Sequence, residues 1–386
     1  MFYGEKLSNL RKLAGLSNEE LANYLRILPK QIVEYENNNI LPSTQTLKGL
    51  SDLFHVKPKY FLSAEYLKDN FSDRQIAYRS TDKRLEKNTN YDHVFLNYAD
   101  YFINYFEQHV IVPAAKISLI KDKCNSMIFN NIATTSIEQI AEFVRQELQF
   151  QDNHDLMYII ENSGIYVLEK DLGHKTDAYS AVTKDGFFFI VLGMEKKSAV
   201  RRNFDLAHEL GHYFLHTNID MTKLSDTNLK AVEKEANRFA AAFLLPRTKF
   251  VADFSKISNP WNPDSYILMK KKYQVALQTL AMRAYNLGLL SKDDKSHFFA
   301  LLTNKGYKTF EPLDDKLVPI RPSKILSLFK FTLDHDLISL QNVLEQFHIS
   351  LEFLLQLFNL DKQFFEQYFN RVSVNDSNLI YLNSFR

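Results

Sequence analysis

The chain has 386 residues, 45% of them hydrophobic and 24% charged, which is the balance of an ordinary globular protein with two or three domains. Its 47 basic and 46 acidic residues nearly cancel, so the overall charge predicts no general affinity for polyanions. A single cysteine, Cys124, excludes an internal disulfide framework and a cysteine-based zinc site. The sequence shows no signal peptide and no apolar run of membrane-spanning length, so we expect a cytoplasmic protein without a membrane partner.

The first 65 residues predict a series of short helices joined by tight turns. We expect helices at residues 2–13, 20–25, 29–36, 43–55 and a short one from residue 58. Ser17 and Glu20 have the spacing of a capping box at the start of the second helix. Pro29 suits the first turn of the third helix, and Ser43 is a suitable N-cap for the fourth.

These helices resemble the helix-turn-helix of XRE-type repressors. The matching residues are Leu7, Leu10, Arg11, Leu16, Ser17, Glu20, Leu21, Ala22, Ile32, Tyr35, Glu36, Asn37, Pro42, Leu47, Leu50, Leu53 and Phe54. In that family the third helix enters the major groove of DNA. The resemblance therefore implies that Pro29, Lys30 and Glu34 face the bases of an operator, and that Asn18 and Asn38 lie near phosphates.

The charge of this segment weakens the expectation of DNA binding. Residues 1–65 contain eight basic and seven acidic residues, whereas DNA affinity depends strongly on phosphate neutralisation. A monomer should therefore bind DNA poorly, and binding would require a homodimer. Use of the helix-turn-helix for protein contacts is the alternative.

Residues 67–135 are predicted to form a helical linker. Within them, residues 71–90 are charged and free of glycine, and residues 91–112 form an aromatic-rich helix. Another helix, capped by Ser136, should follow, and residues 164–168 and 186–192 have the composition of strands. The second strand directly precedes the most informative helix of the chain. It could be an edge strand that aligns a substrate by strand addition, or a plain buried strand.

The segment around residues 206–212 reads H-E-x-x-H within an amphipathic helix. His208 and His212 are four residues apart, so both side chains project from one face of the helix. This spacing suits two ligands of one Zn²⁺ ion, and Glu209 is placed to act as the general base. The alternative is two ordinary histidines on an amphipathic helix.

A catalytic zinc site needs a third protein ligand, and a second predicted helix at residues 232–246 offers two candidates. Glu233 and Glu235 point in different directions because they are two residues apart. The face of Glu233 continues into small residues that allow close helix packing, so we favour Glu233. Asn237, one turn later, could hydrogen-bond a liganding histidine. His216 lies about 12 Å along the helix from His208, too far to join the same site.

The blocks at residues 202–212 and 233–246 resemble the ImmA/IrrE family of metallopeptidases. In that family the second block looks like E-x-x-A-N-x-F-A followed by L-L-x-P, and here Phe243 replaces the first leucine. The resemblance extends over residues 136–305. It implies that Glu233 is the third zinc ligand and that the substrate is a repressor protein.

Together these patterns predict a mainly α protein with a small β-sheet, of the α+β class. We expect a five-helix helix-turn-helix domain at residues 1–66, a helical linker at 67–135, a zincin-like peptidase domain at 136–305 and a helical C-terminal region at 306–386. The predicted function is a DNA-binding regulator with a gluzincin-like, zinc-dependent endopeptidase that cuts a repressor. The alternative is a transcriptional regulator in which the zincin fold is a sensor or scaffold without turnover.

Overall fold

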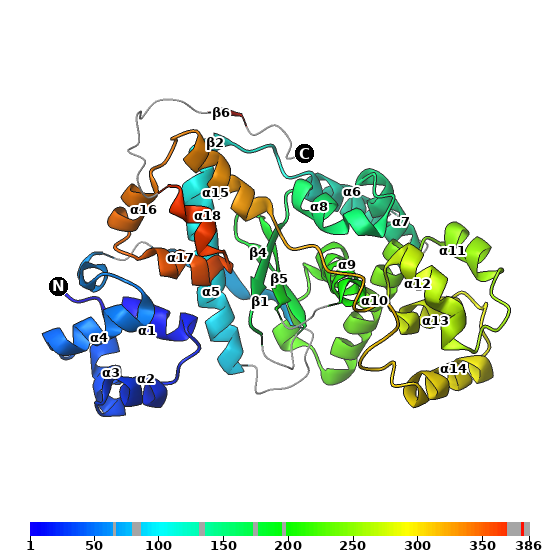
Figure 1. Cartoon of the computed structure of the whole chain (residues 1–386), viewed down its shortest axis with the longest axis horizontal. Coiled ribbons are helices and arrows are strands. Elements are labelled where there is room, and N and C mark those ends of the chain that lie inside the picture. Colours follow the sequence, from blue (N-terminus) through cyan, green and yellow to red (C-terminus); the bar gives the residue numbers. More distant parts are fainter. Residues whose placement is uncertain are drawn as a thin grey trace. The chain divides into compact units, whose positions relative to one another are not determined.

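The computed structural model describes residues 1–64, 67–78, 86–130, 136–172, 177–194, 198–368 and 380–381 (Figure 1). These residues form mainly helices with a small β-sheet, which confirms the predicted α+β class. The chain divides into two compact units. The terminal unit contains residues 1–73, 82–113 and 324–386, and the central unit contains residues 74–81 and 114–323. None of the described helices is long and apolar enough to cross a membrane.

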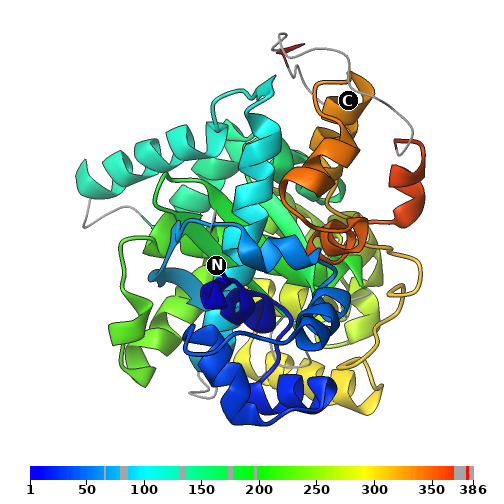
Figure 2. The ribbon, with the colours of Figure 1, turned by 90° about the vertical axis from the view of Figure 1, so that its left-hand side faces the viewer.

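The first helices of the terminal unit lie close to their predicted bounds (Figure 2, blue). They are α1 (Gly4–Leu13), α2 (Asn18–Leu25), α3 (Pro29–Glu36), α4 (Thr44–Phe54) and a 3₁₀ helix at Pro58–Leu62. The predicted capping box is confirmed, because Glu20 N donates to Ser17 Oγ at 3.1 Å and Ser17 N donates to Glu20 Oε2 at 2.7 Å. A Cβ atom on Gly4 would lie 2.3 Å from the carbonyl oxygens of Tyr35 and Glu36, so α1 and α3 approach through a position that only glycine fits.

The same unit contains a long aromatic helix and the C-terminal helices. These are α5 (Glu86–Glu107), α15 (Lys324–Asp334), α16 (Leu340–Gln346), α17 (Leu351–Phe358) and α18 (Lys362–Glu366), and β2 (Val110–Ile111) pairs in parallel with β6 (Ile380–Tyr381). Lys57 N donates to His348 O at 2.7 Å, and Ser350 N donates to His55 O at 2.9 Å. Residues 1–66, predicted as a separate domain, fall in one compact unit with other helices, and the four domain boundaries stay predictions.

The sheet has the strand order β1-β4-β5-β3. Its strands are β1 (Phe71–Tyr78), β3 (Tyr166–Lys170), β4 (Ala178–Thr183) and β5 (Phe188–Gly193). The idea that the strand before the motif helix is an edge strand is wrong, because β5 pairs with β3 on one side and β4 on the other. Residues 71–78, predicted within a helical linker, form the edge strand β1 instead. Charged residues are common on edge strands, which explains why this strand resembled a linker in sequence.

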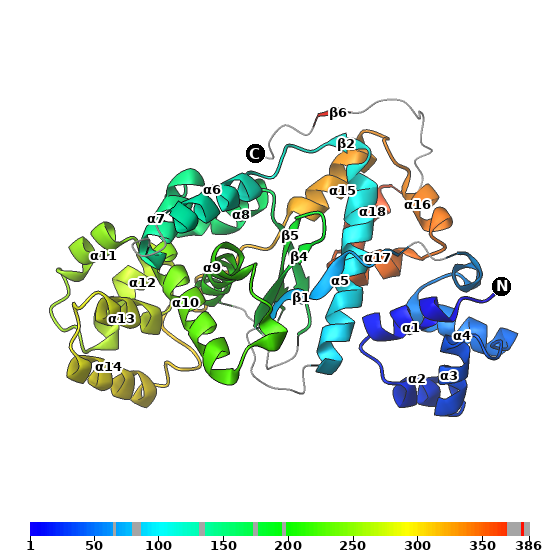
Figure 3. The same ribbon diagram turned by 180° about the vertical axis from the view of Figure 1, so that it is seen from behind.

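The central unit contains nine described α-helices, one of which carries the H-E-x-x-H motif. They are α6 (Lys116–Asn130), α7 (Ile137–Glu147), α8 (Leu156–Asn162), α9 (Ala199–His216), α10 (Asp226–Leu244), α11 (Arg247–Phe254), α12 (Ile267–Tyr273), α13 (Leu277–Asn286) and α14 (Lys292–Asn304). The motif helix α9 lies against β4, β5 and α10 (Figure 3). Its apolar stripe, including Leu206, Leu210 and Phe214, is buried with Phe239 and Phe243 of α10 in one hydrophobic core.

Candidate metal centre

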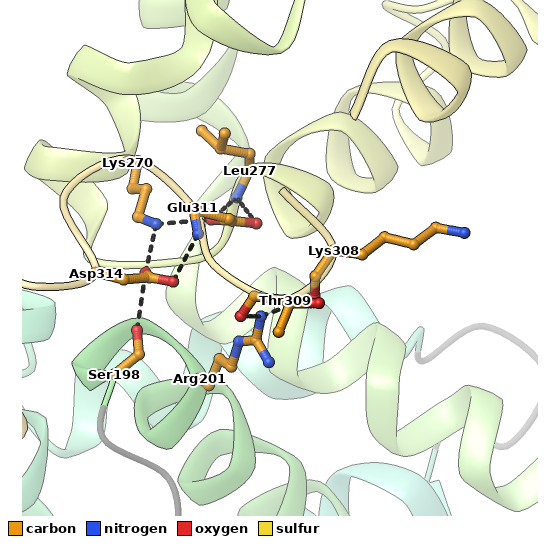
Figure 4. Close-up of polar contacts among 8 residues, drawn as sticks. All are labelled: Ser198, Arg201, Lys270, Leu277, Lys308, Thr309, Glu311 and Asp314. Carbon is orange, nitrogen blue, oxygen red and sulfur yellow. Dashed lines mark hydrogen bonds and ion pairs between the residues drawn. The ribbon is translucent and has the colours of Figure 1, made fainter. Parts of the chain in front are cut away.

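A buried polar cluster holds the start of α9 (Figure 4). Ser198 Oγ, one residue before the helix, donates to Asp314 Oδ1 at 3.0 Å. Lys270 Nζ is buried and lies 2.7 Å from both Asp314 Oδ1 and Glu311 Oε2. Glu311 Oε2 also accepts a hydrogen bond from Leu277 N, the first residue of α13, at 3.0 Å. The loop that carries Glu311 and Asp314 therefore links the start of α9 to α12 and α13.

The approach of α9 to α10 depends on a glycine inside the motif. A Cβ atom on Gly211 would lie 3.1 Å from both Cα and O of Ala236, and 3.3 Å from Cβ of Phe239. These distances are shorter than ordinary van der Waals contacts between carbon atoms. The absence of a side chain at Gly211, together with the small Ala236, thus lets the two helices pack closely enough for their polar side chains to meet.

Three of the predicted site residues meet at this contact. The Nε2 atoms of His208 and His212 are 3.0 Å apart. Glu233 reaches them from α10, with Oε2 at 3.3 Å from His208 Nε2 and Oε1 at 3.2 Å from His212 Nε2. Both histidines are buried, and the side chain of Glu233 is 16% exposed. The structure therefore brings together His208, His212 and Glu233, whose role as metal ligands remains a prediction.

The geometry of this cluster fits a zinc ion. With bonds of about 2.0–2.1 Å, tetrahedral zinc requires ligand atoms about 3.3 Å apart, close to the separations in the cluster. Glu233 Oε1 is buried and accepts no hydrogen bond from the described residues, as expected of an atom available to a metal. Burial would raise the pKa of Glu233, but its interactions with His208 and His212 outweigh burial and lower this pKa to about 2. The carboxylate is therefore ionised at neutral pH, as metal binding requires.

Further polar side chains surround the two histidines. Asn237 Oδ1 lies 3.1 Å from His208 Nδ1, which is the contact that the helical spacing predicted. His216 Nδ1 lies 3.2 Å from His212 Nδ1, and His216 Nε2 lies 3.0 Å from Glu235 Oε2. Burial lowers the pKa of His216 to about 4 against the opposing effect of Glu235, so its imidazole is neutral at pH 7. Glu235, the alternative third ligand, thus contacts His216 and not the pair of histidines that Glu233 joins.

Glu209, the predicted general base, is buried between α9 and the sheet. Its Oε2 atom accepts a hydrogen bond from Ser180 Oγ on β4 at 2.6 Å, and both residues are at most 2% exposed. Ser180 was not predicted from the sequence. The run of β-forming residues around it, Ala178–Thr183, could have indicated a strand, but no local pattern indicates which helix residue that strand faces.

Two cavities lie beside these side chains in the central unit. The larger, about 790 Å³, is lined by Glu233 and Asn237 together with residues of α9, α10, α13 and α14. The smaller, about 290 Å³, is lined by Ser180, His212 and His216 and by the loop after α9. Each cavity therefore offers space for a ligand next to side chains of the candidate centre.

The residues predicted to read DNA lie on or near α3 in the terminal unit. Pro29 and Lys30 are exposed at the start of this helix, where a major groove could reach them. Glu34 is partly exposed, and its Oε2 atom accepts a hydrogen bond from Asn39 Nδ2 at 2.7 Å. Of these positions, only Lys30 offers a positive charge to a phosphate.

The two asparagines expected near phosphates have different surroundings. Asn18 Oδ1 is buried without a hydrogen-bond partner among the described residues, at the first position of α2. Asn38 has a positive φ of 59°, and its Oδ1 atom accepts a hydrogen bond from Gly4 N at 2.8 Å. The side chain of Asn38 therefore caps the start of α1, a structural role that the sequence did not reveal.

Comparison with known families agrees with these two regions. Residues 4–67 match the family model of a helix-turn-helix domain, and residues 160–285 match the model of an IrrE N-terminal-like domain, which describes a peptidase family. No curated protein matches the chain. The chain therefore joins an XRE-type helix-turn-helix domain to an IrrE/ImmA-like domain of the metallopeptidase class. This combination is that of a regulator with a protease-like domain.

Proposed function

We propose that this chain is a DNA-binding regulator that hydrolyses a peptide bond in another protein with the help of Zn²⁺. The observation that supports the proposal most strongly is the convergence of His208, His212 and Glu233, whose ligand atoms lie within 4.8 Å of one another. Glu209 follows His208 directly in the chain and is buried.

In this proposal each side chain has a defined task. His208, His212 and Glu233 hold the ion, and Asn237 orients the His208 ring through the contact at Nδ1. When bound, Zn²⁺ supplies Lewis-acid chemistry that polarises the scissile carbonyl and a water molecule. Glu209 accepts a proton from the attacking water and donates it to the leaving amine. Ser180 Oγ donates to Oε2 of Glu209 and so helps to fix the orientation of this carboxylate.

The substrate that we propose is a repressor protein, on the basis of the resemblance to the ImmA/IrrE family. The helix-turn-helix domain would then bring the chain to an operator, as a homodimer, or contact the repressor directly. Either arrangement would place the peptidase near a protein that acts on the same DNA.

Proteome-wide mapping of protein N-termini would test the proposal and identify the substrate. Cells producing the full chain should contain new N-termini that are absent from cells producing Glu209→Gln, because glutamine keeps the size of the side chain but cannot take the proton. Glu235→Gln is the matched control, since it changes a half-exposed carboxylate on α10 that does not join the cluster, and it should retain cleavage.

Two outcomes would contradict the proposal. If the same new N-termini appeared with Glu209→Gln, the carboxylate would not be the base. If the wild-type chain bound zinc yet produced no new N-termini, the scaffold interpretation would replace the peptidase.

A further inference from the structure

The larger cavity of the central unit has a basic wall on α10. Lys230, Lys234 and Arg238 all line it, and they follow one another at intervals of four residues. Residues four apart on a helix share a face and are separated by about 6 Å along its axis. The three cations therefore form a row of about 12 Å beside Glu233 and Asn237.

This row has no partner within the described part of the chain. No hydrogen bond or ion pair between described residues involves Lys230, Lys234 or Arg238, and all three are exposed. A fourth cation of the cavity, Arg201, is already used, because its Nη2 donates to the carbonyl oxygens of Lys308 and Thr309 at 3.0 Å (Figure 4). The charge of the α10 row is therefore available to a ligand.

The remaining lining residues indicate a ligand that has apolar groups as well as charged ones. Apolar side chains of Phe204, Met282 and Phe299 contribute to the cavity from α9, α13 and α14. Its acidic lining residues are Glu233, which we assign to the metal, Asp205, which is only 2% exposed, and Asp177, which is partly exposed just before β4. Apart from Glu233, the charged α10 residues that line the cavity are therefore all positive, and they lie next to an apolar surface.

We infer that this cavity binds an extended, acidic segment of the polypeptide substrate along the Lys230–Lys234–Arg238 row. Alternate side chains of an extended peptide lie on the same side, about 6.6–6.8 Å apart, which is close to the spacing of the three cations. An acidic residue at every second position could thus face the row, while apolar residues between them contact the rest of the cavity. This inference rests on the proposed peptidase function, because it concerns the substrate of the same site.

Fluorescence anisotropy with the full-length, zinc-loaded chain would test the inference. Glu209→Gln serves as the background, so that the probe is not cut. The probe is a labelled dodecapeptide in which Asp alternates with Ala and Leu, and its comparison is the same peptide with Asn in place of Asp. We expect the Asp peptide to bind about tenfold more tightly, with an affinity that falls as salt rises.

Charge reversal on the helix gives the second arm of the experiment. Lys234→Glu should weaken binding of the Asp peptide by about tenfold. Lys249→Glu is the matched control, because Lys249 is an exposed lysine of the same unit, on α11, that does not line the cavity. It makes the same change in net charge and should leave the affinity within about twofold of its starting value.

Three results would overturn the inference. The first is equal binding of the Asp and Asn peptides, including no binding of either. The second is an equal effect of the two charge reversals. The third is equally tight binding of an oligothymidylate, which would indicate a general polyanion surface. Because binding is measured without cleavage, failure of this inference is distinct from failure of the peptidase proposal. Loss of the Glu209-dependent cleavage would leave a positive binding result unchanged.

Discussion

Helix α3 of the terminal unit carries one basic side chain, Lys30, whereas α10 of the central unit places three along one cavity. Two acidic residues accompany Lys30 on α3, and one of them, Glu36, is already neutralised by Arg11 through contacts of 2.6 and 2.9 Å. Helix α3, the one expected to enter a major groove, is thus the less basic of the two helices. A fold that can enter a major groove does not by itself supply the charge for tight binding.

Each unit should therefore recognise its partner in a different way. The helix-turn-helix segment has the fold to enter a major groove but little net charge, so its DNA affinity should depend on combining two copies on one operator. The central unit has a cavity with unpaired cations next to buried titratable groups, so recognition and chemistry can share one site.

The largest effect on stability should come from Lys270, which is buried and paired, whereas the cations on α10 are exposed and have no partner among the described residues. Lys270 is buried between Glu311 and Asp314, so Lys270→Met leaves two buried carboxylates without their cation. Loss of one partner from a buried ion pair typically costs about 3–5 kcal/mol. We expect the free energy of unfolding, measured by urea denaturation, to fall by about this amount.

Lys271→Met provides the control for that measurement, because Lys271 is the exposed neighbour on the same helix. It should change the free energy of unfolding by less than about 0.5 kcal/mol. Equal effects of the two substitutions would show that the polar cluster in Figure 4 does not hold α9 in place.

A smaller effect is expected at Gly211, where α9 and α10 approach most closely. Gly211→Ala adds a Cβ atom 3.1 Å from Ala236, so α10 must shift by a few tenths of an ångström, and we expect Glu233 to move with it relative to the two histidines. Overpacking of this kind costs about 1–3 kcal/mol, and if that cost falls on the metal site, zinc affinity should drop by about fivefold to 100-fold. Competition with a chromogenic chelator measures that affinity.

Ala231→Ser is a suitable comparison, since Ala231 is exposed on α10 and, two residues from Glu233, points in a different direction from it. Zinc affinity should be unchanged by this substitution. If Gly211→Ala also left the affinity unchanged, the close approach of the helices would not be what positions Glu233.

The smallest effect should occur on DNA, at Lys30. Lys30→Ala removes the only basic side chain of α3, so binding to the cognate operator should weaken several-fold and the salt slope should decrease by about one. A salt-titrated mobility shift with the full chain and the promoter of its own gene measures both. Lys59→Ala, at an exposed position in the 3₁₀ helix that follows α4, should have little effect. No shift at low salt would favour protein contacts as the role of this domain.

The sequence predicted best those features that depend on neighbouring residues. The capping box of α2, the Pro29 start of α3 and the Ser136 cap of α7 are all encoded within four residues, and all are present. The meeting of His208 with His212 follows from one helical turn. Glu233 required an extra step, because its choice over Glu235 depended on which face of α10 has small residues.

Features that join distant parts of the chain could not be predicted in this way. Strand β1 and the inner position of β5 depend on pairing between segments far apart in sequence. The hydrogen bond from Ser180 to Glu209 and the contact of Lys270 with Glu311 cross 29 and 41 residues, and no periodic pattern records them. The sequence of residues 1–65 correctly predicted a helix-turn-helix. It did not predict the backbone hydrogen bonds that join this segment to the C-terminal helices.

The most direct test of the central claim is the zinc content of the purified full-length chain, measured by elemental analysis after dialysis. We predict about one Zn²⁺ per wild-type chain, none in His212→Ala, and an unchanged content in Glu235→Ala, with circular dichroism confirming that each variant is folded. A wild-type chain that retains no zinc, or a folded His212→Ala chain that retains the wild-type amount, would contradict a metal centre formed by His208, His212 and Glu233.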